Sequence, residues 1–305
     1  MTQSTLSRAL DSDVFYSFKR SPLIIAAAVT TLVCILAAVF APILAPHNPF
    51  DLASLNLLDA FTPPSWTAAG KSGYLLGTDD QGRDVLSTIM YGARMSLLVG
   101  LLATLLAMVV GVSLGLIAGY VGGKLDAFIM RVADIQLSFP AILIALLING
   151  IAQSVVPRDM RDQAALYVLV LAIAASGWVR YARTVRGSTL VERSKEYVQA
   201  ARVIGRSKLA IMFTHVLPNV LGPVLVLATL AIGEAIITEA TLSFLGVGVP
   251  PTQPSLGTLI RIGNDFLFSG EWWITVFPGA ALVILVLAIN LLGDWLRDAL
   301  NPKLR

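Results

Sequence analysis

The chain has 305 residues, of which 56% are hydrophobic and only 13% are charged, and its mean hydropathy is +0.77. Soluble domains carry about 25% charged residues, so this composition excludes a soluble enzyme, a disordered chain and a secreted domain. The single cysteine, Cys34, excludes an internal disulfide framework and a cysteine-based zinc site. The net charge of +3 does not indicate a nucleic-acid partner.

Long charge-free segments divide the chain into candidate membrane spans, since a helix needs about 20 mostly apolar residues to cross a bilayer. The first is too long for a cleavable signal peptide, and we expect it to be retained and to begin at Pro22. Another charge-free segment, 240–260, holds three prolines and is expected to form an extramembrane or re-entrant loop. The fold prediction is an all-α integral membrane protein with six transmembrane helices, at residues 22–45, 95–119, 133–153, 163–182, 214–242 and 273–294.

Lysine and arginine are distributed unequally between the two sides of these spans. With a cytoplasmic N-terminus, 16 of the 22 basic residues lie on inner segments, so the positive-inside rule places both termini in the cytoplasm. The expected organisation is a cytoplasmic tail at 1–21, a first transmembrane helix at 22–45, an extracytoplasmic loop at 46–94, a core at 95–294 with an inner loop at 183–213, and a cytoplasmic tail at 295–305.

The inner loop at 183–213 carries eight basic residues in or beside it. We predict a short helix from Glu196 to Ile204, closed by Gly205 in the left-handed conformation, and then Ser207 as the N-cap of a second helix. The small side chains of Ala200 and Ala201 would let another surface approach closely. From the residues alone, a loop that contacts anionic membrane lipid remains an equal alternative.

The spacing of Gln199-Ala200-Ala201, Gly205 and Leu217-Pro218 resembles the EAA loop in the integral membrane subunits of ABC importers. Gln199 replaces the usual Glu, and His215 replaces an apolar residue. In that family the loop forms a coupling helix that docks into a groove on a cytoplasmic ATPase. The resemblance therefore implies an ATPase-coupling loop made of Glu196, Tyr197, Gln199, Ala200, Ala201, Gly205, Leu217 and Pro218.

The outer loop narrows the family further. The run 77–87, followed by 91–94, resembles the dipeptide- and oligopeptide-type "C" subunits of the peptide/nickel class, as do 242–246, 277–279 and 290–303. The resemblance implies the ABC-importer permease (MetI-like) fold. It also implies a motif that shapes the outer mouth or meets a binding protein, made of Gly77, Thr78, Asp79, Gly82, Arg83 and Asp84.

The carboxylates of this outer motif are not expected to bind metal. Counted from Asp79, an EF-hand pattern would place Arg83 at the third ligand position, so the pattern fails. Asp84 is expected instead to cap a helix that leads through Arg94 into the second span. Gly70-Lys71-Ser72 looks like the end of a phosphate-binding loop, but Ser65 stands where the first glycine is needed.

Two carboxylates fall within the fifth span, where charge is costly. Glu234 and Glu239 are candidates for the translocation path, where Glu234 would meet the amino group of a peptide. The alternatives are a structural partner on another helix, or an interfacial carboxylate, with Glu239 near the outer interface. The glycines at 111, 115, 119 and 123 recur every four residues and predict close helix packing.

The expected function is that of a permease subunit importing di- or oligopeptides across the bacterial inner membrane by alternating access. No catalytic residue or cofactor is expected on this chain, and ATP and Mg²⁺ would bind partner subunits. The expected partners are a second homologous permease, two cytoplasmic ATPases, an extracytoplasmic binding protein and membrane lipid. Nickel, glutathione or another small solute is an alternative substrate. An ion-driven secondary transporter is a remoter alternative, and an intramembrane enzyme lacks its usual motifs.

Overall fold

The computed structural model describes residues 13–51 and 55–299, so the tail motif at Pro302 and Lys303 lies outside the described residues. Within the described ranges the regular secondary structure is helical, apart from one isolated antiparallel bridge between Thr78 and Asp84. The all-α prediction is confirmed. The chain divides into two compact units, which are described separately: unit 1 comprises 1–100 and 236–305, and unit 2 comprises 101–235.

Five helical segments are long and apolar enough to cross a membrane, namely Pro22–Val39 (α3), Val85–Val121 (α5), Arg158–Glu192, Lys208–Phe244 and Trp273–Ala299 (α13). The third of these consists of η2 (Arg158–Met160) and α8 (Arg161–Glu192), and the fourth runs from α10 through α11. Helix α3 begins at Pro22, as predicted, because proline already has a helical φ and lacks the N–H that a first turn leaves unpaired. Only 11% of its apolar window is buried. Such a surface suits lipid and not water.

The third predicted span, 133–153, is wrong as a single continuous helix. The region forms α6 (Gly123–Leu137) and α7 (Ala141–Val155), which meet at an angle of 96°. Pro140 explains the break, because it lacks a backbone N–H and its ring crowds the preceding turn. Its backbone is extended, with ψ of 133°, and it caps the start of α7. The described residues therefore contain five unbroken candidate spans, or six if this bent pair counts as one span.

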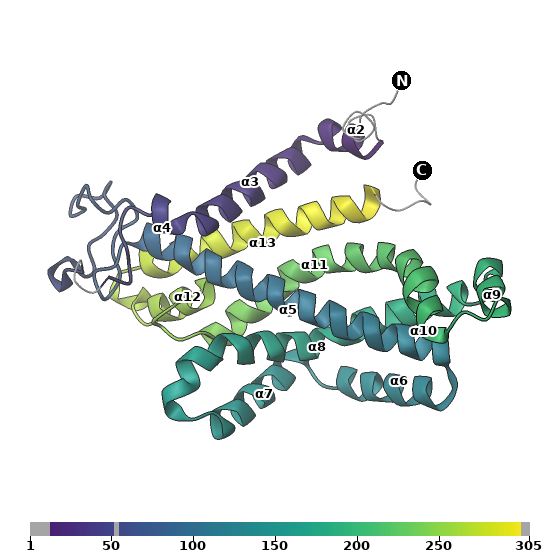
Figure 1. Ribbon diagram of the computed structural model, residues 1–305. Helices are drawn as coiled ribbons and strands as arrows, with labels where there is room; N and C mark the ends of the chain where they lie inside the picture. The colour runs from purple at the N-terminus through teal and green to yellow at the C-terminus, as the bar shows by residue number, and fades with distance from the viewer. Residues whose placement is uncertain (1–12, 52–54, 300–305) are drawn as a thin grey trace. The chain divides into compact units, whose positions relative to one another are not determined.

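Several helices extend beyond their predicted bounds. Helix α5 begins at Val85, ten residues before the predicted span, and continues without a break to Val121 (Figure 1). Helix α8 continues to Glu192, well into the predicted inner loop. The remaining elements are short, namely α2 (Asp13–Arg20), α4 (Ala41–Leu44), η1 (Leu57–Asp59), α9 (Glu196–Val203), α10 (Lys208–Ile211), η3 (Met212–Val216), α12 (Leu256–Asn264) and η4 (Leu267–Ser269). The long helix of the segment Lys208–Phe244 is α11 (Leu217–Phe244).

The glycine repeat of α5 packs unit 2 together, as predicted. A Cβ on Gly115 would lie 2.4 Å from the carbonyl oxygen of Ala182, and one on Gly111 would lie 2.4 Å from that of Trp178. Both contacts are with α8, so these glycines let α5 and α8 approach at backbone distance. Gly123 is not part of this contact: no atom lies within 4 Å of its Cβ position, and its φ is +64°.

The core of unit 1 contains a helix that the sequence did not predict. The proline-rich segment 240–260 is not one helix, as expected, but α12 begins inside it. Ser255 caps α12 by accepting a hydrogen bond from the N–H of Thr258 at 3.3 Å. Leu256 and Leu259 are buried against Leu285 of α13. The break between α11 and α12 is therefore a loop that returns the chain to the core.

Candidate functional site

Helix α9, which carries the predicted coupling residues, ends as the sequence indicates. Gly205 has φ of +79°, the N–H of Arg206 donates to the carbonyl of Ala201 at 3.1 Å, and that of Gly205 donates to Arg202 at 3.0 Å. This pair of bonds is a Schellman motif, which requires a left-handed residue after the helix. Gly205 thus contributes its conformation, since open space surrounds its Cβ position.

The chain then enters α11 through an irregular turn. Ser207 accepts a hydrogen bond from the N–H of Ala210 at 3.3 Å, which confirms it as an N-cap. Residues Met212–Val216 form a π-helical turn between α10 and α11. Pro218 accounts for the wider turn, because it has no N–H to donate and its ring would crowd the carbonyl four residues earlier. The Leu217-Pro218 pair therefore sets the path by which α9 joins a membrane-spanning helix.

The two alanines of the motif do not share a face. Ala201 is only 3% exposed and packs in the core of unit 2 with Val198, whereas Ala200 is exposed. The prediction that Ala201 offers a surface to a partner is therefore not supported by its placement. Two apolar side chains at the end of α9 are largely exposed, namely Val203 at 87% and Ile204 at 75%. Neither was predicted from the sequence, because their exposure depends on how α9 packs against the core of unit 2 and not on a local pattern.

Three side-chain contacts connect α9 to the long helices of unit 2. The amide of Gln199 donates to the carbonyl of Arg193, at the end of α8, at 3.1 Å. Arg202 lies over the ring of Tyr120 in α5 at 5.2 Å. Tyr197 accepts a hydrogen bond from Asn219 of α11 at 3.1 Å. Figure 1 shows α9 and α10 at the end of unit 2 where α5 turns into α6.

Tyr197 is central to this connection. Its hydroxyl donates to the carboxylate of Glu192, and its ring stacks on His215 at 6.4 Å. Burial, followed by the neighbouring Glu192 carboxylate, raises the pKa of Tyr197 to about 12. The hydroxyl therefore keeps its proton at physiological pH and can donate to Glu192 while it accepts from Asn219. Glu196 lies in the first turn of α9, where a negative charge favours the helix dipole.

The predicted outer motif is buried and holds its own loop together. Asp79 accepts hydrogen bonds from the N–H groups of Gln81 and Arg83 at 2.9 Å and from Nε of Arg83 at 2.6 Å. Asp84 accepts from the N–H of Ser87 at 2.8 Å and so caps α5, as predicted. Thr78 is fully buried, and its carbonyl accepts from Nε1 of Trp273 at 3.0 Å. These side chains shape the segment without facing its surface.

Gly77 and Gly82 are required by the backbone of the same loop. Their φ angles are +84° and +75°, values that glycine adopts without steric cost. A Cβ would also lie 2.6 Å from the carbonyl oxygen of Thr62 at Gly77, and 2.5 Å from that of Asn56 at Gly82. Both glycines therefore serve the fold of the 46–94 segment.

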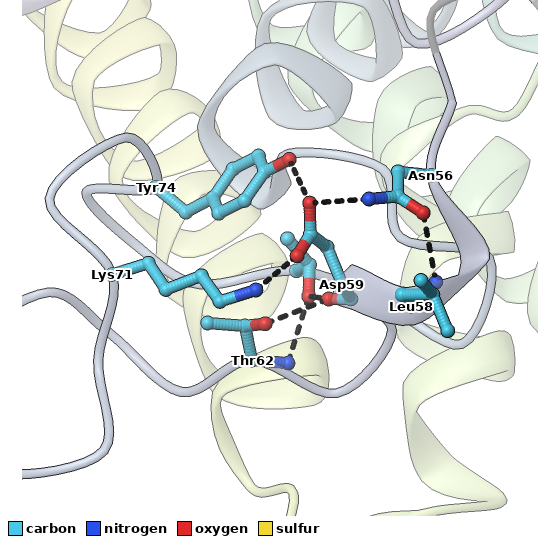
Figure 2. A network of polar contacts seen from close by, with 7 residues as sticks. Asn56, Leu58, Asp59, Thr62, Lys71 and Tyr74 are labelled. Carbon is cyan, nitrogen blue, oxygen red and sulfur yellow. Dashed lines mark hydrogen bonds and ion pairs between the residues drawn. The ribbon is translucent and has the colours of Figure 1, made fainter.

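A polar network around Asp59 fixes the rest of this segment (Figure 2). The carboxylate of Asp59 accepts from Lys71, from the hydroxyl of Tyr74 at 3.1 Å and from the amide of Asn56 at 3.4 Å. Its backbone carbonyl accepts from the hydroxyl of Thr62 at 2.8 Å. The hydrogen bond from Lys71 holds the pKa of Asp59 below its usual value. Lys71 is thus a structural residue of this segment.

The arginines on one side of α8 each bind a carboxylate from another helix of unit 2. Arg180 binds Glu234 of α11 with two bonds, at 2.5 and 2.8 Å. Arg183 binds Asp134 of α6 at 2.5 Å, and Arg186 binds Asp126 with two bonds, at 2.5 and 2.7 Å. The pairing of Glu234 with Arg180 was not predicted from the sequence, because the two residues are 54 positions apart.

Glu239 has a different environment from Glu234. It is completely buried in unit 1. Its carboxylate accepts hydrogen bonds from Ser96 of α5 at 2.7 Å and from Ser243 of α11 at 2.6 Å. A buried carboxylate with two hydroxyl donors is a packing element. Its placement therefore favours a structural role over one in the translocation path.

The comparisons with known proteins agree with this architecture. Residues 111–305 match the family of binding-protein-dependent transport system inner membrane components, and residues 12–64 match the N-terminal TM domain of oligopeptide transport permease C. The whole chain is 42% identical to a dipeptide transport system permease protein of Escherichia coli over that protein's full length. It is 39% identical to a di/tripeptide transport system permease protein of Pseudomonas aeruginosa, with 90% of this chain and 86% of the relative covered.

A solved structure shares the fold. Inward-facing MetNI, a methionine ABC transporter, matches with a TM-score of 0.52 at 18% identity, covering 70% of this chain and 96% of that one. The chain is thus a multi-pass protein of the bacterial inner membrane. It belongs to the binding-protein-dependent transport family, whose members are the permease subunits of ABC importers.

Proposed function

We propose that this chain is one of two permease subunits in an ATP-driven importer of dipeptides and longer peptides. The observation that carries the substrate class is the 42% identity to a dipeptide permease over the full length of both chains. A relative that carries di- and tripeptides is also similar over most of its length. A second homologous permease would complete the path, and a binding protein outside the membrane would deliver the peptide.

Two separate ATPase subunits would supply the energy at α9. Val203 and Ile204 present an exposed apolar surface there, and apolar residues at the centre of a contact supply most of its binding energy. Gln199 and Ala200 are exposed beside them. In this proposal the docking surface is Gln199, Ala200, Val203 and Ile204, while Ala201 and Gly205 keep α9 in shape. ATP and Mg²⁺ would bind the ATPases and not this chain.

The contacts of α9 suggest how its movement would reach the membrane. Gln199, Arg202 and Tyr197 connect it to the ends of α8, α5 and α11 respectively. A displacement of α9 by the closing ATPase dimer would therefore act on three long helices together. This coupling supports alternating access, in which the path opens outward when ATP is bound and inward after hydrolysis.

The experiment that tests the proposal is dipeptide uptake into proteoliposomes that contain the complete importer. We expect uptake of radiolabelled dialanine only with ATP on the ATPase side and binding protein on the other side. Nickel and glutathione are the matched alternative substrates, and neither should enter at a comparable rate. Uptake of dialanine without ATP, or ATP-driven uptake of nickel alone, would contradict the proposal.

A further inference from the structure

The ion pair between Arg180 and Glu234 lies well inside two membrane-spanning helices. Arg180 is twelve residues before the end of α8 at Glu192, or about 18 Å at 1.5 Å per residue. Glu234 is ten residues before the end of α11 at Phe244, or about 15 Å. The segment 163–179 before Arg180 and the segment 209–233 before Glu234 contain no charge. Each group therefore lies within its helix and not at its end, and Arg180 is among the last three residues of the span predicted at 163–182.

Both charged side chains are accessible despite this position. The side chain of Arg180 is 42% exposed and that of Glu234 is 58% exposed, whereas Asp126, in the similar pair with Arg186, is only 16% exposed. An exposed charge in contact with hydrocarbon is costly, so charged residues in spanning helices face a water-filled cavity or another protein. The exposed face of this pair, like that of the neighbouring pair of Arg183 (48% exposed) and Asp134 (56% exposed), is thus expected to meet water or a partner subunit and not lipid.

We propose that Arg180 and Glu234 are specificity-determining residues that bind the two charged ends of a peptide during its passage. Glu234 accepts hydrogen bonds from the terminal ammonium group, and Arg180 donates two parallel hydrogen bonds to the terminal carboxylate. Before the peptide arrives, the two side chains neutralise each other through their bidentate contact. This inference rests on the proposed function, because it assumes that a peptide is transported.

The connection between this pair and α9 suggests how the Arg180–Glu234 ion pair would open to receive a peptide. Glu234 is on α11, which begins at Leu217 directly after the turn that follows α9 and α10. Arg180 is on α8, which ends at Glu192 just before α9. A movement of α9 acts on both helices and would separate the guanidinium from the carboxylate. The open pair would then offer one site of each charge to a zwitterionic peptide.

The test uses the complete importer in proteoliposomes, with dialanine-loaded binding protein as the substrate. The neutral double variant R180Q/E234Q removes both charges and keeps similar shapes. We expect ATP hydrolysis within about twofold of the wild type and dialanine delivery per ATP reduced by about tenfold, the size of effect that one charge-assisted hydrogen bond has. The swapped variant R180E/E234R keeps an ion pair with its charges exchanged and should show the same loss of delivery.

The matched control is R186Q/D126N, which removes an equally bidentate but less exposed pair on the same helix. Any change that this variant causes in ATP hydrolysis should be matched by an equal change in dialanine delivery, so that delivery per ATP stays at the wild-type value. Delivery by R180E/E234R at the wild-type rate would overturn the inference, because it would show that any ion pair at this position is sufficient. If the wild-type importer delivers no dialanine at all, the proposed function fails, and that outcome is distinct from normal delivery by the variants.

Discussion

Ser96 of α5 donates a hydrogen bond to Oε2 of Glu239 of α11 at 2.7 Å, and its own oxygen accepts from the N–H of Leu256 at 3.2 Å. One hydroxyl group thereby joins three segments of unit 1 that are up to 160 residues apart. The second oxygen of the carboxylate accepts from Ser243 at 2.6 Å. Because all of these groups are buried, every donor and acceptor here has to be satisfied inside the protein.

Replacing Ser96 with alanine should destabilise unit 1 markedly. The substitution leaves the N–H of Leu256 without its acceptor and removes a donor from Glu239, and each unsatisfied buried group costs about 1–3 kcal/mol. Thermal unfolding of the purified importer in detergent measures the effect. Ser113→Ala is the control, because Ser113 is exposed and its hydroxyl donates to the carbonyl of Val109 in its own helix. Equal melting temperatures for the two variants would contradict the structural role of Ser96.

Gly115→Ala should weaken the contact of α5 with α8. The added methyl group would lie 2.4 Å from the carbonyl oxygen of Ala182, so the helices would have to separate, and overpacking of this kind costs about 1–3 kcal/mol. Gly150→Ala in α7 is the matched control, since nothing lies within 4 Å of its Cβ position. That control should be neutral or stabilising by up to about 1 kcal/mol, as alanine favours helix. Thermal unfolding that ranks the two variants in the opposite order would contradict the packing.

The polar network around Asp59 should make the 46–94 segment sensitive to acid. The folded protein lowers the pKa of Asp59 from its ordinary value near 3.8, so its stabilising contribution is complete above that value and is lost as pH falls through the lower folded pKa. Hydrogen exchange of residues 56–78, corrected for intrinsic rates, should show protection that falls only below about pH 4.

Asp59→Asn should remove most of this protection at neutral pH as well. The exposed Asp265, which lies outside the network, provides the control substitution Asp265→Asn. An Asp59→Asn variant that keeps the protection of the wild type at pH 7 would show that Lys71 and Tyr74 do not need the carboxylate.

The sequence predicted the helices better than it predicted what they face. Charge-free segments located five spans, and Pro22, Ser207 and Asp84 were identified as start signals because capping depends on neighbouring residues. The break at Pro140 was harder to predict, since a proline in an apolar segment can either kink a helix or end it. Only the structure shows that α6 and α7 meet at 96°.

In the candidate site, too, features set by neighbouring residues were predicted, whereas features set by residues far apart in the chain were not. The left-handed conformation of Gly205 follows from its place after a short helix. The burial of Ala201 and the exposure of Val203 depend on where α9 lies against the core of unit 2, and no local pattern contains that information. Glu234 was recognised as an unusual charge, but its partner Arg180 is on another helix. Pairing across helices is set by packing and not by spacing along the chain.

The central claim is that α9 transmits ATP hydrolysis to the membrane through an apolar contact at Val203 and Ile204. The most direct measurement compares ATP-driven dialanine uptake, and retention of the ATPase on the purified permease, for V203D/I204D and for the milder V203A/I204A. The account predicts that the aspartates release the ATPase and reduce uptake by about tenfold or more, because two charges would be buried in an apolar contact, whereas the alanines reduce it less. Full uptake and full ATPase retention by V203D/I204D would contradict it.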